Sequence, residues 1–460
     1  MADGPSGLPG RRAQWLDQLR SLTLNEWLLL LAIGLIELPN AFTPPWNQAV
    51  VVLALLPLWW LIVRAANGAR GRRRTAIRQA WRGHRWLLTA LGIFGLLQSV
   101  AFIRAPTLTP LRAPLILDTG LLLAVVVFWF PARAESRHRL GWLVVGSLWA
   151  AVALNLLLAV LGLRSGSLFY GSNPQSESLM LGLIGLRQPA VLFPLALGVN
   201  GFGVVIGAAW VTAALAVWQL AEGTRRLWWL AGLSALAVFM LALTDSRGPS
   251  IAAALTILLI LIPGKAVRRL LPVMVFVPIV LPVVLVGATS GALGQETGLL
   301  VGAEQAPVLQ LSGRTQIWSA ALAELAEPVP GHLVGFGYAG HVAAGLSEQF
   351  SQVRSLAADP NSLGAHNLVL QLVLDSGYFG AALMLLTLGL IIRDLGRLAS
   401  VDDNGLGTVF LGLMCYSVLI GALERVPTVY TEELFVLMLL TAGYVIGRQA
   451  AVTAGGVGPN

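Results

Sequence analysis

Residues 227–262 read LWWLAGLSALAVFMLALTDSRGPSIAAALTILLILI, two apolar runs separated by five small or polar residues, Thr244 to Gly248. Each run approaches the roughly 20 apolar residues with which an α-helix crosses a bilayer. Such runs recur along all 460 residues, which are 56% hydrophobic and 11% charged, whereas a soluble domain is roughly 25% charged. The sequence therefore predicts a protein that crosses a membrane several times.

We expect an all-α fold, a polytopic bundle of about 12 transmembrane helices with a large helical extracytoplasmic loop. The expected spans are residues 24–39, 48–63, 87–103, 113–131, 140–163, 195–218, 227–243, 249–262, 270–288, 367–392, 406–423 and 433–447. This divides the chain into a cytoplasmic N-terminal segment (1–23), spans one to nine (24–288), a periplasmic loop (289–366), spans ten to twelve (367–447) and a cytoplasmic tail (448–460).

The distribution of positive charge predicts the orientation. Of the 30 Lys and Arg residues, 22 lie in alternate connections that include both ends of the chain. Cytoplasmic loops are enriched in positive charge, so we expect both termini in the cytoplasm and the protein in a bacterial inner membrane, in contact with membrane lipids. The net charge of +8 thus reflects topology, and we expect no nucleic-acid partner. The N-terminus lacks the apolar core of a cleaved signal peptide.

Eight arginines fall on the opposite, periplasmic side, where positive charge is disfavoured. They are Arg104, Arg112, Arg164, Arg187, Arg247, Arg314, Arg354 and Arg425. Contact with outer-leaflet phosphates is the ordinary explanation for such an arginine. Two of them have more specific surroundings, and a histidine joins them.

Arg247 lies between two apolar runs with almost no loop, where it either pairs with Asp245 and extends to the membrane surface or faces a lipid phosphate. Arg314 precedes an apolar pattern, Ile317 to Leu325, that predicts an amphipathic helix within the large loop. An arginine at a helix start favours anion binding, although Ser312 or Thr315 could simply cap that helix.

His366 begins the tenth predicted span at the outer interface. Such a histidine is usually a cap or core residue, but it is also a suitable general base for a hydroxyl. The sequence GFGYAG at 335–340 matches GxGxxG but follows no strand, so it does not indicate a dinucleotide site. No clustered acids and histidines indicate a metal, and we expect neither a metal nor another cofactor.

Taken together, these motifs resemble the O-antigen ligase/polymerase superfamily over roughly residues 180–392. The motifs are SRG at 246–248, SGRxxIW at 312–318, GxG at 335–337 and HNLxLQxxxDxGxxG at 366–380. The resemblance implies a GT-C-type membrane glycosyltransferase. Such enzymes take a glycan from undecaprenyl pyrophosphate on the outer leaflet and pass it to a lipid or glycan acceptor hydroxyl, with inversion and without a metal.

The resemblance also implies that Arg247, Arg314 and His366 carry the chemistry. Fixed guanidinium groups suit a leaving pyrophosphate, because arginine stays charged and grips phosphate oxygens with two N–H donors. His366 would orient or deprotonate the acceptor. Candidates for substrate binding are Arg187, Ser246, Ser312 and Asn367. Family members often carry Glu in place of Asp375, which we therefore leave out of the chemistry.

Three alternatives stay open at this point. Within the superfamily, a polymerase passes the glycan to a second lipid-linked unit, and a related branch passes it to protein serine or threonine. From another class, a transporter or flippase would use acids within the spans, for which Asp118 and Asp375 are best placed. The notable groups instead collect at one face, which favours surface chemistry.

Overall fold

The structure is a computed structural model of the 460-residue chain. It describes residues 23–37, 46–67, 70–105, 112–129, 136–162, 178–186, 188, 190–191, 193–194, 198–262, 265–290, 314–327, 329–349, 364–400, 405–426 and 433–454. Within these residues the regular elements are helices and no strand occurs, as the apolar runs predicted.

Helices of the bundle occur at each of the predicted spans. They are α2 (Leu24–Glu37), α3 (Trp46–Asn67), α4 (Arg70–Arg104), α5 (Arg112–Ala124) with η3 (Val125–Trp129), α7 (Ser136–Val160), α9 (Gly198–Leu220), α10 (Gly223–Leu243), α11 (Arg247–Leu261), α12 (Lys265–Leu270) with η4 (Leu271–Phe276) and α13 (Val277–Ser290), α20 (Leu368–Leu398), α21 (Leu406–Gly421) and α22 (Glu433–Ala454). The shorter helices are α8 (Leu179–Gly182), α15 (Arg314–Ala326), α16 (Gly331–Val334), α17 (Gly340–Ala343) and α18 (Leu346–Gln349).

The protein is a multi-pass membrane protein, and its apolar helices differ in length. Six described helices are long and apolar enough to cross a membrane, and five more apolar helices have 10 to 17 residues. The longest of the six is Leu368–Leu398 in α20, whereas α11 and α21 are too short to qualify alone. The number of about twelve spans therefore stays a prediction.

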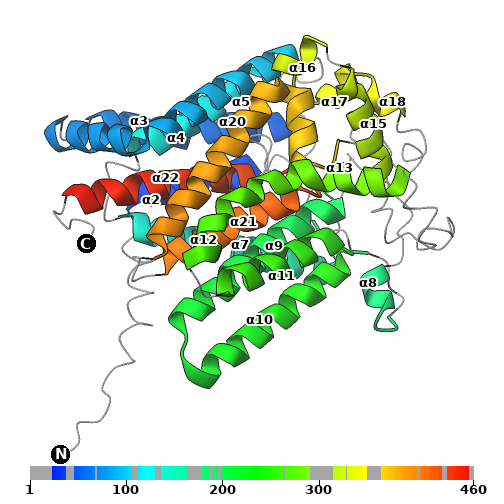
Figure 1. Ribbon diagram of the computed structural model, residues 1–460. Coiled ribbons are helices and arrows are strands. Elements are labelled where there is room, and N and C mark those ends of the chain that lie inside the picture. The colour runs from blue at the N-terminus through cyan, green and yellow to red at the C-terminus, as the bar shows by residue number, and fades with distance from the viewer. Residues whose placement is uncertain are drawn as a thin grey trace, which may run out of the picture.

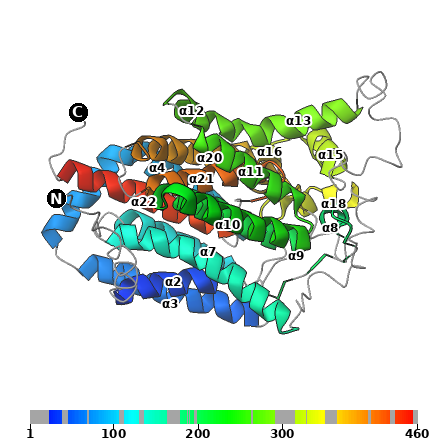
Figure 2. The same cartoon turned by 90° about the horizontal axis from the view of Figure 1, so that it is seen from below.

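The long helices lie side by side, and the short ones gather at one end of the bundle (Figures 1 and 2). Helices α8, α15 and α18 lie at the end that Figure 1 shows on the right, and α12 lies toward the opposite end. Helix α21 is buried along almost its whole length, while α10 exposes most of its apolar side chains. Thus α21 belongs to the core, and α10 presents an apolar surface suited to lipid.

A kink in α20 receives the glycine-rich segment. Gly377 has φ +74° and ψ −179°, which interrupts the helix and leaves the carbonyls of Leu374 and Asp375 without their usual helical partners. Phe336 N–H donates to the Leu374 carbonyl at 2.7 Å, and Gly337 N–H donates to the Asp375 carbonyl at 3.1 Å. The GxG segment thus packs against the kink and donates hydrogen bonds to two of its backbone carbonyls.

We predict that Gly377→Ala destabilises the fold. A Cβ there would lie 2.2 Å from the Leu333 carbonyl oxygen, and the backbone conformation is one that essentially only glycine adopts. The expected loss is about 2 kcal/mol or more in the free energy of unfolding, read as a lower thermal midpoint. The control is Gly389→Ala in the same helix. An added Cβ there would meet nothing closer than 3.9 Å, so the thermal midpoint should change little. Equal midpoints for the two variants would contradict this account of the kink.

Candidate functional site

A carboxylate, Glu424, joins a guanidinium and an imidazole at the bundle end that carries the short helices. Its Oε1 accepts a hydrogen bond from Arg314 Nη2, and its Oε2 lies 3.0 Å from His366 Nδ1. The exposed side-chain fractions are 8% for Glu424, 13% for Arg314 and 27% for His366. The cluster is therefore nearly buried, and it opens to the outside mainly through the imidazole.

Arg314 is positioned by the amphipathic helix that the sequence predicted. It is the first residue of α15, whose buried face carries Ile317, Trp318 and Ala321. The Trp318 indole N–H donates to the carbonyl oxygen of Ala365 at 2.9 Å, directly before His366. The SGRxxIW motif thus connects the two members of the site: its arginine binds Glu424, and its tryptophan holds the backbone next to the histidine.

His366 lies in a loop that is fixed on both sides. Gln371 accepts a hydrogen bond from Ala365 N–H at 2.9 Å. Asn367 caps α20 by accepting from the N–H groups of Val369 and Leu370, and its amide donates to the carbonyls of Pro278 and Ala422. His366 itself has φ +46°, a left-handed conformation that is costly for a residue with a Cβ. These bonds maintain it and direct the imidazole toward Glu424.

The charge state of Glu424 follows from its neighbours. Burial by itself raises the pKa of this carboxyl, but the positive charge of Arg314 and the hydrogen bonds from His366 and Arg314 outweigh burial, so the pKa is lowered. Glu424 is therefore ionised at neutral pH. A neutral His366 then donates its Nδ1 proton to Glu424, which leaves Nε2 as the proton acceptor.

This lowered pKa predicts a defined pH dependence of stability. A carboxyl with a depressed folded-state pKa contributes stability above its unfolded value, and that stability is lost as the pH falls through the folded-state pKa. We expect wild type to have a higher thermal midpoint than Glu424→Gln at pH 7, with a difference that shrinks only below about pH 4.5. A difference that stays constant down to pH 3 would contradict an ionised Glu424.

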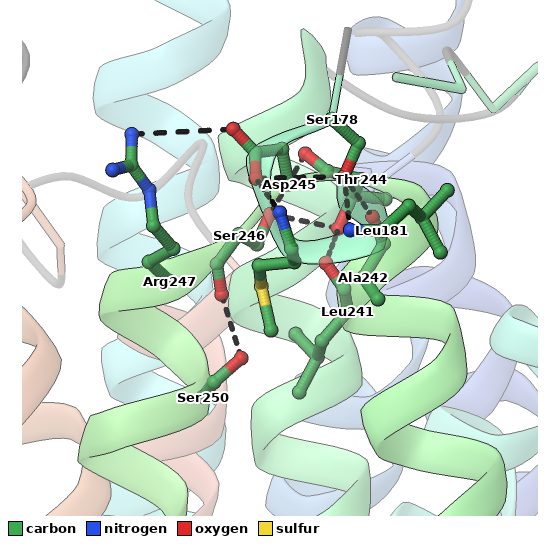
Figure 3. Close-up of polar contacts among 10 residues, drawn as sticks. Ser178, Leu181, Leu241, Ala242, Thr244, Asp245, Ser246, Arg247 and Ser250 are labelled. Carbon is green, nitrogen blue, oxygen red and sulfur yellow. Dashed lines mark hydrogen bonds and ion pairs between the residues drawn. The ribbon is translucent and has the colours of Figure 1, made fainter. Parts of the chain in front are cut away.

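Arg247 lies at the start of α11, beside a tightly bonded turn (Figure 3). Asp245 has φ +50°, and its Oδ1 accepts a hydrogen bond from Met180 N–H at 3.1 Å. Ser178 Oγ donates to the Ala242 carbonyl at 2.7 Å and caps α8. The Arg247 guanidinium lies 3.9 Å from Asp245 and is 34% exposed. The turn thus holds the backbone of Arg247 while its side chain stays partly accessible.

Contacts between neighbouring residues place Arg247 near the Glu424 cluster. A Cβ on Gly248 would lie 3.3 Å from Leu423 Cδ1, so the residue after Arg247 packs against the residue before Glu424. The loops after α10 and α21 therefore meet at one bundle end. This closeness of backbones brings the three sequence-predicted catalytic residues to a common region, although only Arg314 and His366 share a direct partner.

The predicted substrate-binding residues have different environments. Ser246 is 1% exposed and bonds the Thr244 hydroxyl, so it holds the turn. Asn367 is wholly buried, and its amide oxygen and nitrogen bond four backbone groups, so its visible role is structural. Arg187 and Ser312 lie outside the described residues. A part in substrate binding stays a prediction for all four.

Sequence reasoning missed Glu424, the residue at the centre of the cluster. Its position offered one signal. Glu424 and Arg425 are adjacent charged residues just after a long apolar run, and an acid there needs a partner. The sequence did not reveal that partner, because Arg314 lies 110 residues away along the chain. Among the described residues, no three His, Cys, Asp or Glu side chains group where they could hold a metal ion.

Comparison with known proteins identifies a related family. The family model described as O-antigen ligase matches residues 232–385. These residues include Arg247, Arg314, His366 and the kinked part of α20, and they end before Glu424. No curated protein matches the chain. The match confirms the resemblance to the O-antigen ligase superfamily that the motifs indicated.

Proposed function

We propose, from the premise that residues 232–385 form an O-antigen ligase domain, that this membrane protein transfers a glycan from undecaprenyl pyrophosphate to an acceptor hydroxyl. The single observation that carries the proposal is the bridge from Glu424 to Arg314 and His366. It combines, in one nearly buried cluster, an anion-binding group and a base, which are the two functions that such a transfer needs.

His366 and Glu424 form the proton-accepting half of the site. The acceptor oxygen attacks the anomeric carbon while its proton passes to His366 Nε2. Glu424 binds Nδ1, so it fixes the orientation of the ring and stabilises the imidazolium ion that forms. Attack from the face opposite the leaving group gives inversion at the anomeric carbon. No covalent bond to the protein is formed in this sequence.

Arg314 and Arg247 form the half that receives the leaving group. As the bond from the anomeric carbon to the pyrophosphate oxygen breaks, negative charge develops on the pyrophosphate. Arg314 uses one of its five N–H donors to bind Glu424, and other donors are left for phosphate oxygens. Arg247 is partly exposed and would add a second guanidinium. The two arginines thus supply the charge stabilisation that a divalent ion supplies in other transferases, so we propose a metal-independent reaction.

The distribution of charge supports a periplasmic site in a bacterial inner membrane. Arg314, His366 and Glu424 lie at the bundle end opposite the described arginine-rich connections, such as 265–269 and 393–400. By the positive-inside rule those connections face the cytoplasm, and the cluster faces the periplasm. Asp375, one of the two acids that a transporter would use, is instead bonded to Gly340 N–H and to Gln371, within the packing around the kink.

The test is reconstitution of the full-length protein in liposomes with a defined lipid-pyrophosphate glycan and candidate acceptors. We expect an acceptor to gain the glycan and free lipid pyrophosphate to appear in equal amount. The identity of that acceptor separates a ligase from a polymerase and from a protein glycosyltransferase. Movement of the intact glycolipid between leaflets, with no lipid pyrophosphate released, would replace the proposal with a flippase. His366→Ala protein is the matched control.

A further inference from the structure

Four arginines converge on one groove at the end of α20 that lies away from His366. Helix α12, η4 and the last turns of α20 enclose a cavity of about 940 Å³. It is lined by Arg268, Arg269, Pro272, Arg393, Gly396, Arg397, Ala399 and Ser400. The lining within the described part of the chain thus holds four guanidinium groups and no carboxylate. In both views of the bundle, α12 lies away from α15 and α18 (Figures 1 and 2).

Contacts behind the groove hold its arginines in place. Asp394 is 3% exposed, and it accepts a hydrogen bond from Arg393 Nε at 2.9 Å and lies 3.8 Å from Arg397 Nη1. On its other side it pairs with the buried His84 of α4, at 3.2 Å from Nδ1. Arg268 Nη1 donates to the Ala399 carbonyl at 3.4 Å, which ties α12 to the end of α20. These contacts organise Arg268, Arg393 and Arg397 before any ligand arrives.

We propose that this groove binds the phosphate headgroup of an anionic phospholipid. Guanidinium groups bind phosphate oxygens with paired, charge-assisted hydrogen bonds, and basic pockets between membrane helices are suited to such headgroups. Arginines that serve only as topology signals need no common cavity, whereas these four come from two elements and share one. A site of this kind is separate from the Glu424 cluster, and its occupancy does not depend on glycan transfer.

The surroundings of the groove favour a lipid over a soluble phosphate. The lining arginines of α12 are followed by Leu270, which ends that helix, and by Val273 and Phe276 of η4, and each of the three is more than half exposed. Their spacing of three residues places them on one face of a 3₁₀-helix. An acyl chain attached to a headgroup in the groove would lie along this apolar face. A free phosphate has no apolar part that could contact this face.

The test measures lipid retention by the full-length protein in nanodiscs of equal parts phosphatidylglycerol and phosphatidylcholine. Native mass spectrometry counts each lipid that stays bound. We expect wild type to retain phosphatidylglycerol preferentially, and Arg269→Gln with Arg397→Gln to reduce that retention about tenfold. The control, Arg78→Gln with Arg225→Gln, removes two exposed arginines from outside the groove lining and should retain the lipid. Arg269→Gln alone is the second variant if the double variant misfolds.

Three results would overturn the proposal. An equal loss in both double variants would show that overall charge alone attracts the lipid. Unchanged retention in the groove variant would show that the groove is not the site. Full displacement of phosphatidylglycerol by millimolar inorganic phosphate would assign the groove to a soluble phosphate.

Discussion

Arg314→Ala is expected to lower the rate of glycan transfer by about 100- to 1000-fold, while the protein still inserts in the membrane. In the proposed mechanism this guanidinium is a donor to the leaving pyrophosphate, and the substitution removes it. It also leaves Glu424 buried without its strongest partner, so a fall in stability of about 3–5 kcal/mol should accompany the loss of rate. Transfer is measured on reconstituted protein at saturating donor, and stability is measured as the thermal midpoint.

A second substitution separates these two effects. Arg314→Ala combined with Glu424→Gln removes the unpaired buried charge, so most of the lost stability should return while transfer stays low. Recovery of transfer in the double variant would show that Arg314 acts only by neutralising Glu424, and it would remove the arginine from phosphate binding. Arg314→Lys keeps the charge but loses the planar pair of donors, and it should recover part of the rate.

His366→Ala is expected to lower the rate of transfer by about 100- to 10,000-fold, with a smaller effect on stability than Arg314→Ala. The imidazole is the most accessible member of the cluster, and its Nε2 is the atom left to accept the proton of the acceptor. Because the proposed mechanism assigns the donor phosphates to Arg314 and Arg247, the affinity for the glycolipid should change little. The measurement compares single-turnover rates with glycolipid binding in the same preparation.

The matched control for this variant is His332→Gln. His332 is a buried histidine of α16 that contacts Glu324 and the rings of Phe336 and Tyr378, away from Glu424. It should keep most of the transfer rate. If both histidine variants lose transfer to the same extent, general disturbance of the short helices explains the loss. Wild-type turnover in His366→Ala would remove the base from the mechanism.

The sequence was sufficient for the all-helical class, and a described helix occurs at each predicted span. Length and hydropathy place a helix in the bilayer, but they do not say which of its faces meets lipid, because both lipid and protein core are apolar. That is why α10, whose side chains are largely exposed, and α21, which is buried, look alike as sequence. The kink at Gly377 could not be foreseen either, since it depends on contact with Leu333.

The sequence singled out Arg314 and His366 of the candidate cluster, and it did not single out the acid that joins them. Arg314 and His366 stand in motifs whose order indicated a family, and the structure gives both residues a common partner. Glu424 carries no motif, and its importance arises from a tertiary contact. The expected amphipathic helix was confirmed as α15, which packs through Trp318 on the start of α20. The predicted roles of Asn367 and Ser246 were untested, and both side chains are occupied by backbone and turn contacts.

The most direct test of the shared site is an experimental structure of the full-length protein with a lipid pyrophosphate bound. We expect pyrophosphate oxygens within hydrogen-bonding distance of both Arg314 and Arg247, with His366 Nε2 facing the side from which an acceptor would approach. A pyrophosphate bound away from Glu424, or an Arg247 guanidinium directed into the acyl chains, would contradict it.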